Sequence, residues 1–144
     1  MVEVKFYDNV ADEFLKFAVI ISKTDNKWVF CKQKERETYE IPGGHREPGE
    51  SILETTKREL QEETGAVDFR IEPICVYSVK GKTRVNENID DETFGMLFIA
   101  DINSFEELHS EIEKILISDK LVENWTYPLI QPILIEEAKK RGFI

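Results

Sequence analysis

Short apolar runs and alternating positions recur along this chain, which is the pattern of β-strands. Residues 2–6 (VEVKF) alternate with a period of two, as in a strand with one buried face. Residues 17–22 (FAVIIS) and 28–31 (WVFC) are apolar runs rich in β-branched or aromatic side chains. The turn-forming residues 24–27 (TDNK) lie between these two runs. Together they predict a hairpin with a four-residue connection.

The second half of the chain contains three more apolar runs of strand length. They are residues 71–79 (IEPICVYSV), 93–102 (TFGMLFIADI) and 112–117 (IEKILI). Residues 80–92 are polar, and a loop of this length is often functional. Residues 104–108 (SFEEL) predict a short helical turn capped by its serine.

Local signals predict a helix in the middle of the chain. Ser51 and Glu54 fit a capping box, and Gly65 fits the left-handed position that ends many helices. One stripe of this helix is predicted to pack on the sheet, namely Leu53, Thr56, Leu60 and Thr64.

A second helix is predicted from Pro128 to about Arg141, with Gly142 beyond its end. Several strands with one middle and one terminal helix predict an α/β (α+β) fold, in which helices flank a mixed sheet. The length of 144 residues predicts a single domain, 1–144.

Charge and composition narrow the classes of function. Acidic residues number 29 against 19 basic ones, a net charge of −10, which disfavours binding to duplex nucleic acid. The first residues, MVEVKFYDN, lack the apolar core of a secretory signal, and no apolar run is long enough to span a membrane, so we expect neither secretion nor a membrane partner. Cys31 and Cys75 lie in apolar runs and are expected to be reduced. We therefore expect a cytoplasmic location.

The middle helix carries three carboxylates on adjacent positions of one face. Glu59, Glu62 and Glu63 fall within an arc of roughly 100° and repel one another. Such a cluster can be a solvated face. It can also hold a hard cation such as Mg²⁺, which takes carboxylate and carbonyl oxygens. The glycine pair before the helix and the single cation Arg58 within the cluster favour the second interpretation.

The joint spacing of these residues resembles a known signature, the Nudix box of the Nudix hydrolases. The matching positions read Gly44-x5-Glu50-x7-Arg58-Glu59-Leu60-x-Glu62-Glu63-x-Gly65. Ala66, a small residue at the final aliphatic position, is the only soft departure. The strands predicted around the box fit the αβα sandwich of that family.

The resemblance implies hydrolysis of a nucleoside diphosphate linked to another group, with Mg²⁺ or Mn²⁺ as cofactor. Carried over by position, the metal ligands are Glu59, Glu62, Glu63 and the Gly44 carbonyl. Arg58 and Glu50 are implied as partners that orient the helix.

Family members often take another carboxylate from just before a late strand. Glu111 and Glu113 are the candidates here, and Glu113 lies better relative to the strand that follows. The general base is expected to be a glutamate of the helix or of this later segment.

The arrangement around the box resembles the MutT-type branch, which acts on nucleoside triphosphates and in part on oxidised guanine nucleotides. Lys32 and Lys34 are candidates for binding phosphates, and Asn124, with Thr126 as an equal contender, for reading a purine edge. Trp125, Tyr127 and Phe94 can stack on a base, although at least two of them are expected in the core.

Other pyrophosphate substrates remain open, namely dinucleotide polyphosphates, ADP-ribose and RNA 5′ ends. A Nudix-fold binding module without catalysis also remains open, although this chain keeps every box carboxylate. A homodimer is the default assembly.

Overall fold

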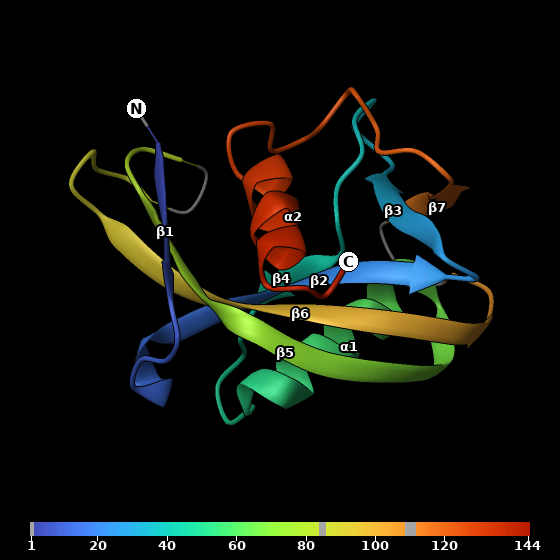
Figure 1. The fold of residues 1–144 in the computed structure, drawn as a ribbon, viewed down its shortest axis with the longest axis horizontal. Coiled ribbons are helices and arrows are strands. Elements are labelled where there is room, and N and C mark those ends of the chain that lie inside the picture. The colour runs from blue at the N-terminus through green and yellow to red at the C-terminus, as the bar shows by residue number, and fades with distance from the viewer. Residues whose placement is uncertain (1, 84–85, 109–111) are drawn as a thin grey trace.

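The computed structural model describes residues 2–83, 86–108 and 112–144, except the side chain of residue 113. Seven strands make up the sheet (Figure 1), and they are β1 (Glu3–Tyr7), β2 (Leu15–Thr24), β3 (Lys27–Gln33), β4 (Gly43–His45), β5 (Ala66–Lys80), β6 (Glu92–Phe105) and β7 (Ile112–Ser118). The helices are the 3₁₀ turn η1 (Asp12–Phe14), α1 (Ile52–Thr64) and α2 (Gln131–Lys140).

The sheet is mixed. Its strand order is β1-β5-β6-β2-β3-β7, and β4 pairs with β2 off this path. β2 runs parallel to β6, and the other pairs are antiparallel. Figure 1 shows α2 on one side of the sheet and α1 on the other. The predicted mixed sheet flanked by helices is therefore confirmed.

Alternation along β2 supplies both faces of the sheet with core residues. Ile20 packs in a cluster with Leu60 of α1. The next residue, Ile21, packs in a second cluster with Leu134 of α2. Successive side chains of a strand point to opposite faces, so the central strand contributes to both layers.

The first hairpin is tighter than its sequence predicts. The connection between β2 and β3 has two residues, Asp25 and Asn26, because Thr24 already pairs with Lys27. Both turn residues have positive φ, 49° and 63°, which is typical of a type I′ turn. The prediction of a four-residue connection was wrong because the strand pairing extends further than the apolar runs.

Tertiary contacts overrule three other local predictions. Ser104 pairs with Asp68 in the ladder of β5 and β6, so the chain stays extended where a helical turn was expected. The last helix begins at Gln131, not at Pro128, and has a proline in its first turn. Leu53 of α1 is exposed, and the buried stripe starts with Thr55 instead.

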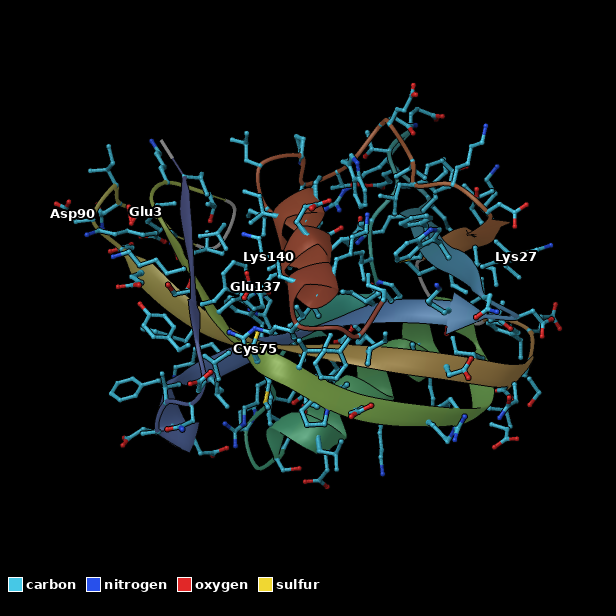
Figure 2. All side chains as sticks on the ribbon, in the orientation of Figure 1. Glu3, Lys27, Cys75, Asp90, Glu137 and Lys140 are labelled. Carbon is cyan, nitrogen blue, oxygen red and sulfur yellow. The ribbon has the colours of Figure 1, made fainter. Side chains whose placement is uncertain are left out.

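Charged side chains are spread around the molecule. Figure 2 shows Lys27 at one end of the sheet and Asp90 at the other, while Glu137 and Lys140 project from α2. In the described part of the chain, no helix is long and apolar enough to cross a membrane. Cys31 and Cys75 are free thiols inside the protein.

The loop between β5 and β6 is organised by a buried asparagine. Asn86 is 1% exposed. Its side-chain amide donates to the carbonyls of Val79 at 2.8 Å and Asp91 at 3.0 Å. The Thr93 hydroxyl donates to its Oδ1 at 2.8 Å. One side chain thus satisfies three polar groups that the loop removes from water.

We expect Asn86→Ala to lower the free energy of unfolding by about 2–4 kcal/mol, because it leaves these partners unsatisfied in a buried place. Urea denaturation measures the change. Asn103→Ala is the matched control, since that asparagine is exposed and makes a 3.4 Å bond to Asp68. The control should change stability by no more than about 0.5 kcal/mol. Equal effects of the two substitutions would contradict the assignment.

Candidate active site

Helix α1 is held at both ends as its sequence predicts. The Ser51 hydroxyl accepts from the Glu54 N–H at 3.1 Å, and the Glu54 carboxylate accepts from the Ser51 N–H at 2.9 Å. Gly65 ends the helix with φ 77° and ψ 15°. These caps fix which helical face the carboxylates occupy.

Strand β4 brings the glycine pair against that helix. Gly43 and Gly44 pair with Val19 and Ala18 of β2. A Cβ on Gly44 would overlap the Glu59 carboxylate, with Glu59 Oε2 only 2.6 Å away. Only glycine therefore lets the Glu59 carboxylate lie so close to this backbone. The sequence did not predict a strand here, because a three-residue glycine-rich segment lacks a strand pattern.

Arg58 is the centre of the carboxylate cluster. Its Nε and Nη2 bond to the Glu50 carboxylate at 2.6 and 3.0 Å, a bidentate pair. Its Nη1 donates to Glu59 at 2.7 Å and to Glu62 at 3.4 Å, and Nη2 also reaches the His45 carbonyl at 3.0 Å. The hydrogen bonds from Arg58 lower the pKa of Glu50 to about 2. Arg58 thus holds the helix and the preceding loop together.

Glu63 and Glu59 are the most desolvated carboxylates of the cluster. The Gly43 N–H donates to Glu63 Oε1 at 2.7 Å. Burial, with a smaller contribution from neighbouring carboxylates, nevertheless raises the pKa of Glu63 to about 8. Burial also raises the pKa of Glu59, against the opposing effect of Arg58. A nearby cation would relieve both.

The donor set fits a hard divalent cation. Among the described residues, no three potential ligand side chains are already gathered around one point. Glu59 accepts from Arg58 through Oε1, and Glu63 accepts from Gly43 through Oε1, so these hydrogen bonds do not use the Oε2 of either carboxylate. The Glu62 side chain is about half exposed, and the Gly44 backbone lies beside Glu59. Together with Glu59 and Glu63, these residues would supply only oxygen ligands.

A cavity of about 460 Å³ opens beside this cluster. Glu59, Gly44 and His45 are among the residues that line it. Its apolar walls come from both the sheet and the C-terminal segment, and include Phe17, Val19, Tyr77, Tyr127, Ile130 and Leu134. This volume is in the range of small-molecule sites. Sequence reasoning missed Phe17 and Tyr77 because their strand periodicity marks them only as core.

The predicted phosphate-binding lysines lie outside this lining. Lys32 is buried at 6% exposure within β3, and Lys34 is exposed beyond the end of that strand. The residue between them, Gln33, lines the cavity instead.

The predicted base-reading residues also lie apart from the cavity. The Asn124 amide donates to the Glu37 carbonyl at 2.9 Å. The Thr126 hydroxyl shares a 2.7 Å hydrogen bond with Thr38. Both residues thus fasten the C-terminal segment to the loop after β3. Neither is among the residues that line the cavity.

Two of the three candidate aromatic residues pack on other rings. Trp125 meets Phe30 edge to face at 5.5 Å between ring centroids. Phe94 packs on Tyr7 at 5.5 Å. Tyr127 lines the cavity.

The remaining carboxylate candidates fall outside the described part of the chain. Glu111 is not described, and the side chain of Glu113 is not described either. The backbone of Glu113 lies in β7, and β7 contacts α1.

Residues 14–131, well over half of the chain, match the profile of the NUDIX domain. The chain belongs to the NUDIX family. The residues around Arg58 therefore form the box of a Nudix hydrolase, and the protein is a pyrophosphohydrolase. Nudix hydrolases generally use divalent metals.

Individual relatives agree with this assignment. YtkD of Bacillus subtilis (strain 168), whose name proposes that it is an 8-oxo-dGTP diphosphatase, is 27% identical over 154 residues, covering 99% of this chain and 92% of YtkD. The crystal structure of a mutant of the B. subtilis pyrophosphohydrolase BsRppH has a TM-score of 0.78 and 26% identity, covering 99% of this chain and 92% of that one. A Caenorhabditis elegans Ap4A hydrolase complex shares the fold, with a TM-score of 0.67 at 14% identity over 88% of this chain and 96% of that one.

Proposed function

We propose that this Nudix enzyme hydrolyses a purine nucleoside triphosphate, unmodified or oxidised, to a monophosphate and pyrophosphate with Mg²⁺. The observation that carries the proposal is the cavity, which is lined both by apolar side chains and by Glu59 and Gly44 of the box. A base can lie between Phe17, Tyr77 and Leu134 while its phosphates extend to the carboxylates. The similarity to YtkD supports the same class of substrate.

In the proposed reaction, Glu59, Glu62, Glu63 and the Gly44 carbonyl hold the cation. When bound, Mg²⁺ would neutralise the phosphates, acidify a water ligand and align it for in-line attack on phosphorus. Arg58 keeps the helix and the loop in place through its bonds to Glu50 and Glu59.

The attacking water must lose a proton during this reaction. A glutamate of the helix, or Glu113 from the neighbouring strand, accepts that proton. Lys32, Lys34 and Asn124 are given no contact with the substrate in this proposal, because none of them lines the cavity.

Product analysis over a substrate panel tests this function. The panel contains dGTP, 8-oxo-dGTP, ATP, a dinucleotide tetraphosphate, ADP-ribose and a 5′-triphosphorylated RNA, each with Mg²⁺ and with EDTA. We expect a nucleoside monophosphate and pyrophosphate from a purine triphosphate, and at least about a hundredfold loss of rate with EDTA. If ADP-ribose, the dinucleotide or the RNA were hydrolysed fastest, that compound would replace the purine triphosphate as the proposed substrate. Undiminished turnover in EDTA would overturn the metal assignment.

A further inference from the structure

Arg46 lies in the loop between β4 and α1, and its guanidinium makes four hydrogen bonds. Nε donates to the Glu50 carbonyl at 2.7 Å. Nη1 donates to the carbonyls of Asp12 and Leu15 at 2.9 and 3.3 Å, and Nη2 donates to Asp12 Oδ2 at 2.8 Å. Three of the four acceptors are therefore main-chain carbonyls. They belong to η1, to the first residue of β2 and to the loop itself.

These bonds close the loop on itself and fasten it to the sheet. The Arg46 N–H donates to the Lys16 carbonyl at 2.8 Å, so the main chain of Arg46 is held by β2. The side chain then reaches the carbonyl of Glu50, the last residue before the helix cap. Within the loop, the Glu47 N–H donates to Glu50 Oε1 at 2.9 Å. Arg46 thus joins both ends of the turn to one strand.

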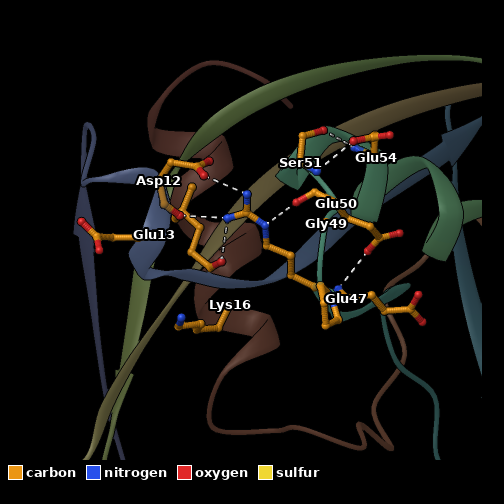
Figure 3. Close-up of a pocket in the computed structure, with 11 residues that line it drawn as sticks. Asp12, Glu13, Lys16, Glu47, Gly49, Glu50, Ser51 and Glu54 are labelled. Atoms are coloured by element: carbon orange, nitrogen blue, oxygen red, sulfur yellow. Dashed lines mark hydrogen bonds and ion pairs between the residues drawn. The ribbon is translucent and has the colours of Figure 1, made fainter.

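The surroundings of Arg46 argue against a role in binding phosphate. It borders an open hollow beside the start of α1 (Figure 3). Figure 3 shows Asp12, Glu13, Glu50 and Glu54 around this hollow. Glu47 and Lys16 also border it, so five carboxylates face Lys16 and the already bonded Arg46, and this excess of negative charge would repel a phosphate. The Arg46 side chain is 19% exposed and already bonded to carbonyls and to Asp12.

A continuous set of contacts leads from Arg46 to the carboxylates of the box. Arg46 holds the main chain of Glu50. The Glu50 side chain holds Arg58 through two hydrogen bonds, and Arg58 holds Glu59. We propose that Arg46 is a positioning residue, which sets the loop so that Glu50 and Arg58 orient the Glu59 carboxylate toward a divalent cation. This inference rests on the proposed function, since it assumes that the box binds the cation.

The test compares Arg46→Ala and Arg46→Lys with the unaltered protein. Mn²⁺ affinity is measured by electron paramagnetic resonance, and kcat and KM with the best triphosphate of the panel. Loss of an outer partner of a metal ligand weakens affinity or activity by roughly ten- to a hundredfold. We expect Arg46→Ala to weaken Mn²⁺ binding and lower kcat by about that factor, with KM within about threefold. Arg46→Lys should lose less, because its single nitrogen can replace only part of the fork.

Arg141→Ala is the matched control. Arg141 is also an ion-paired arginine with a 28% exposed side chain, bonded to Glu137 at 2.8 Å and to Asp8 at 3.5 Å. It lies at the end of α2, away from the box. The control should leave Mn²⁺ affinity and kcat unchanged, even if it lowers the thermal midpoint as much as Arg46→Ala does.

Wild-type Mn²⁺ affinity and kcat in both Arg46 variants would overturn the proposal. A KM raised tenfold or more with unchanged kcat and Mn²⁺ affinity would also overturn it, since that result indicates a substrate contact. If Arg46→Ala does not fold, Arg46→Lys decides by the same measurements. If the protein turns over no triphosphate, the proposed function fails, and Mn²⁺ affinity alone still tests the role of Arg46.

Discussion

Glu63→Gln is expected to lower kcat by about a thousandfold at saturating Mg²⁺. Glutamine keeps the size of the side chain, and its carbonyl oxygen can still accept from the Gly43 N–H. It removes the charge that a cation needs, and such a contribution is worth several kcal/mol in the transition state, where about 4 kcal/mol corresponds to a thousandfold. Steady-state kinetics measure the loss. Glu72→Gln, at an exposed position on β5, is the control and should retain full activity. Near-normal turnover by Glu63→Gln would remove Glu63 from the metal ligands.

In the metal-free protein, by contrast, Glu63→Gln should make the fold more stable than wild type at high pH. Burial raises the pKa of Glu63 to about 8 from its ordinary value of 4.5. Between these two pH values the folded state holds a proton that the unfolded state releases, so stability falls as pH rises. We expect the free energy of unfolding of the wild type to fall by a few kcal/mol between pH 5 and pH 9, as a pKa shift of this size implies. Glu63→Gln should lack this loss in urea denaturation with EDTA, and equal slopes for both proteins would contradict it.

Gly44→Ala is expected to lower kcat by about a hundredfold. The new Cβ would overlap the Glu59 carboxylate, so either that side chain or β4 must move. A misplacement of about 1 Å in a catalytic constellation costs roughly this factor. Kinetics and Mn²⁺ binding measure the effect, and both should fall together.

Gly142→Ala separates close contact from backbone strain. Gly142 has φ 84°, and a Cβ there meets nothing within 4 Å. Its substitution should cost about 1 kcal/mol of stability, through strain alone, and leave turnover unchanged. If Gly44→Ala also lost only stability, the close approach of Gly44 to Glu59 would have no catalytic role.

Sequence predicted best those elements whose signals are local. The caps Ser51, Glu54 and Gly65 bond within a few residues of themselves, so they define α1 without knowledge of the rest of the chain. The turn expected at Ser104 failed because its alternative partner, Asp68, lies far away in sequence. A serine cap is worth about 1 kcal/mol, and a continuing β-ladder can exceed that.

In the candidate site, too, contacts within one sequence motif could be predicted and contacts to distant segments could not. Arg58 and Glu50 lie eight positions apart within the box, and their bidentate pair follows from the resemblance. The role of Arg46 depends on Asp12 and Leu15, which no spacing rule connects to it. Lys32 was predicted to bind phosphate from its place near a strand end, but that place does not reveal that its side chain is buried.

The parallel pairing of β2 with β6 has a consequence for how the protein folds. A two-residue turn joins β2 to β3, whereas the parallel pairing of β2 with β6 places Leu15 beside Phe94, far away in the sequence. Closing so long a loop costs entropy before its contacts form, and folds rich in such contacts fold slowly. β4, with Gly43 and Gly44, pairs with the same strand. The sheet that supports catalysis is therefore complete only after the slowest contacts form, so a chain still being synthesised lacks a working site until β6 has paired with β2.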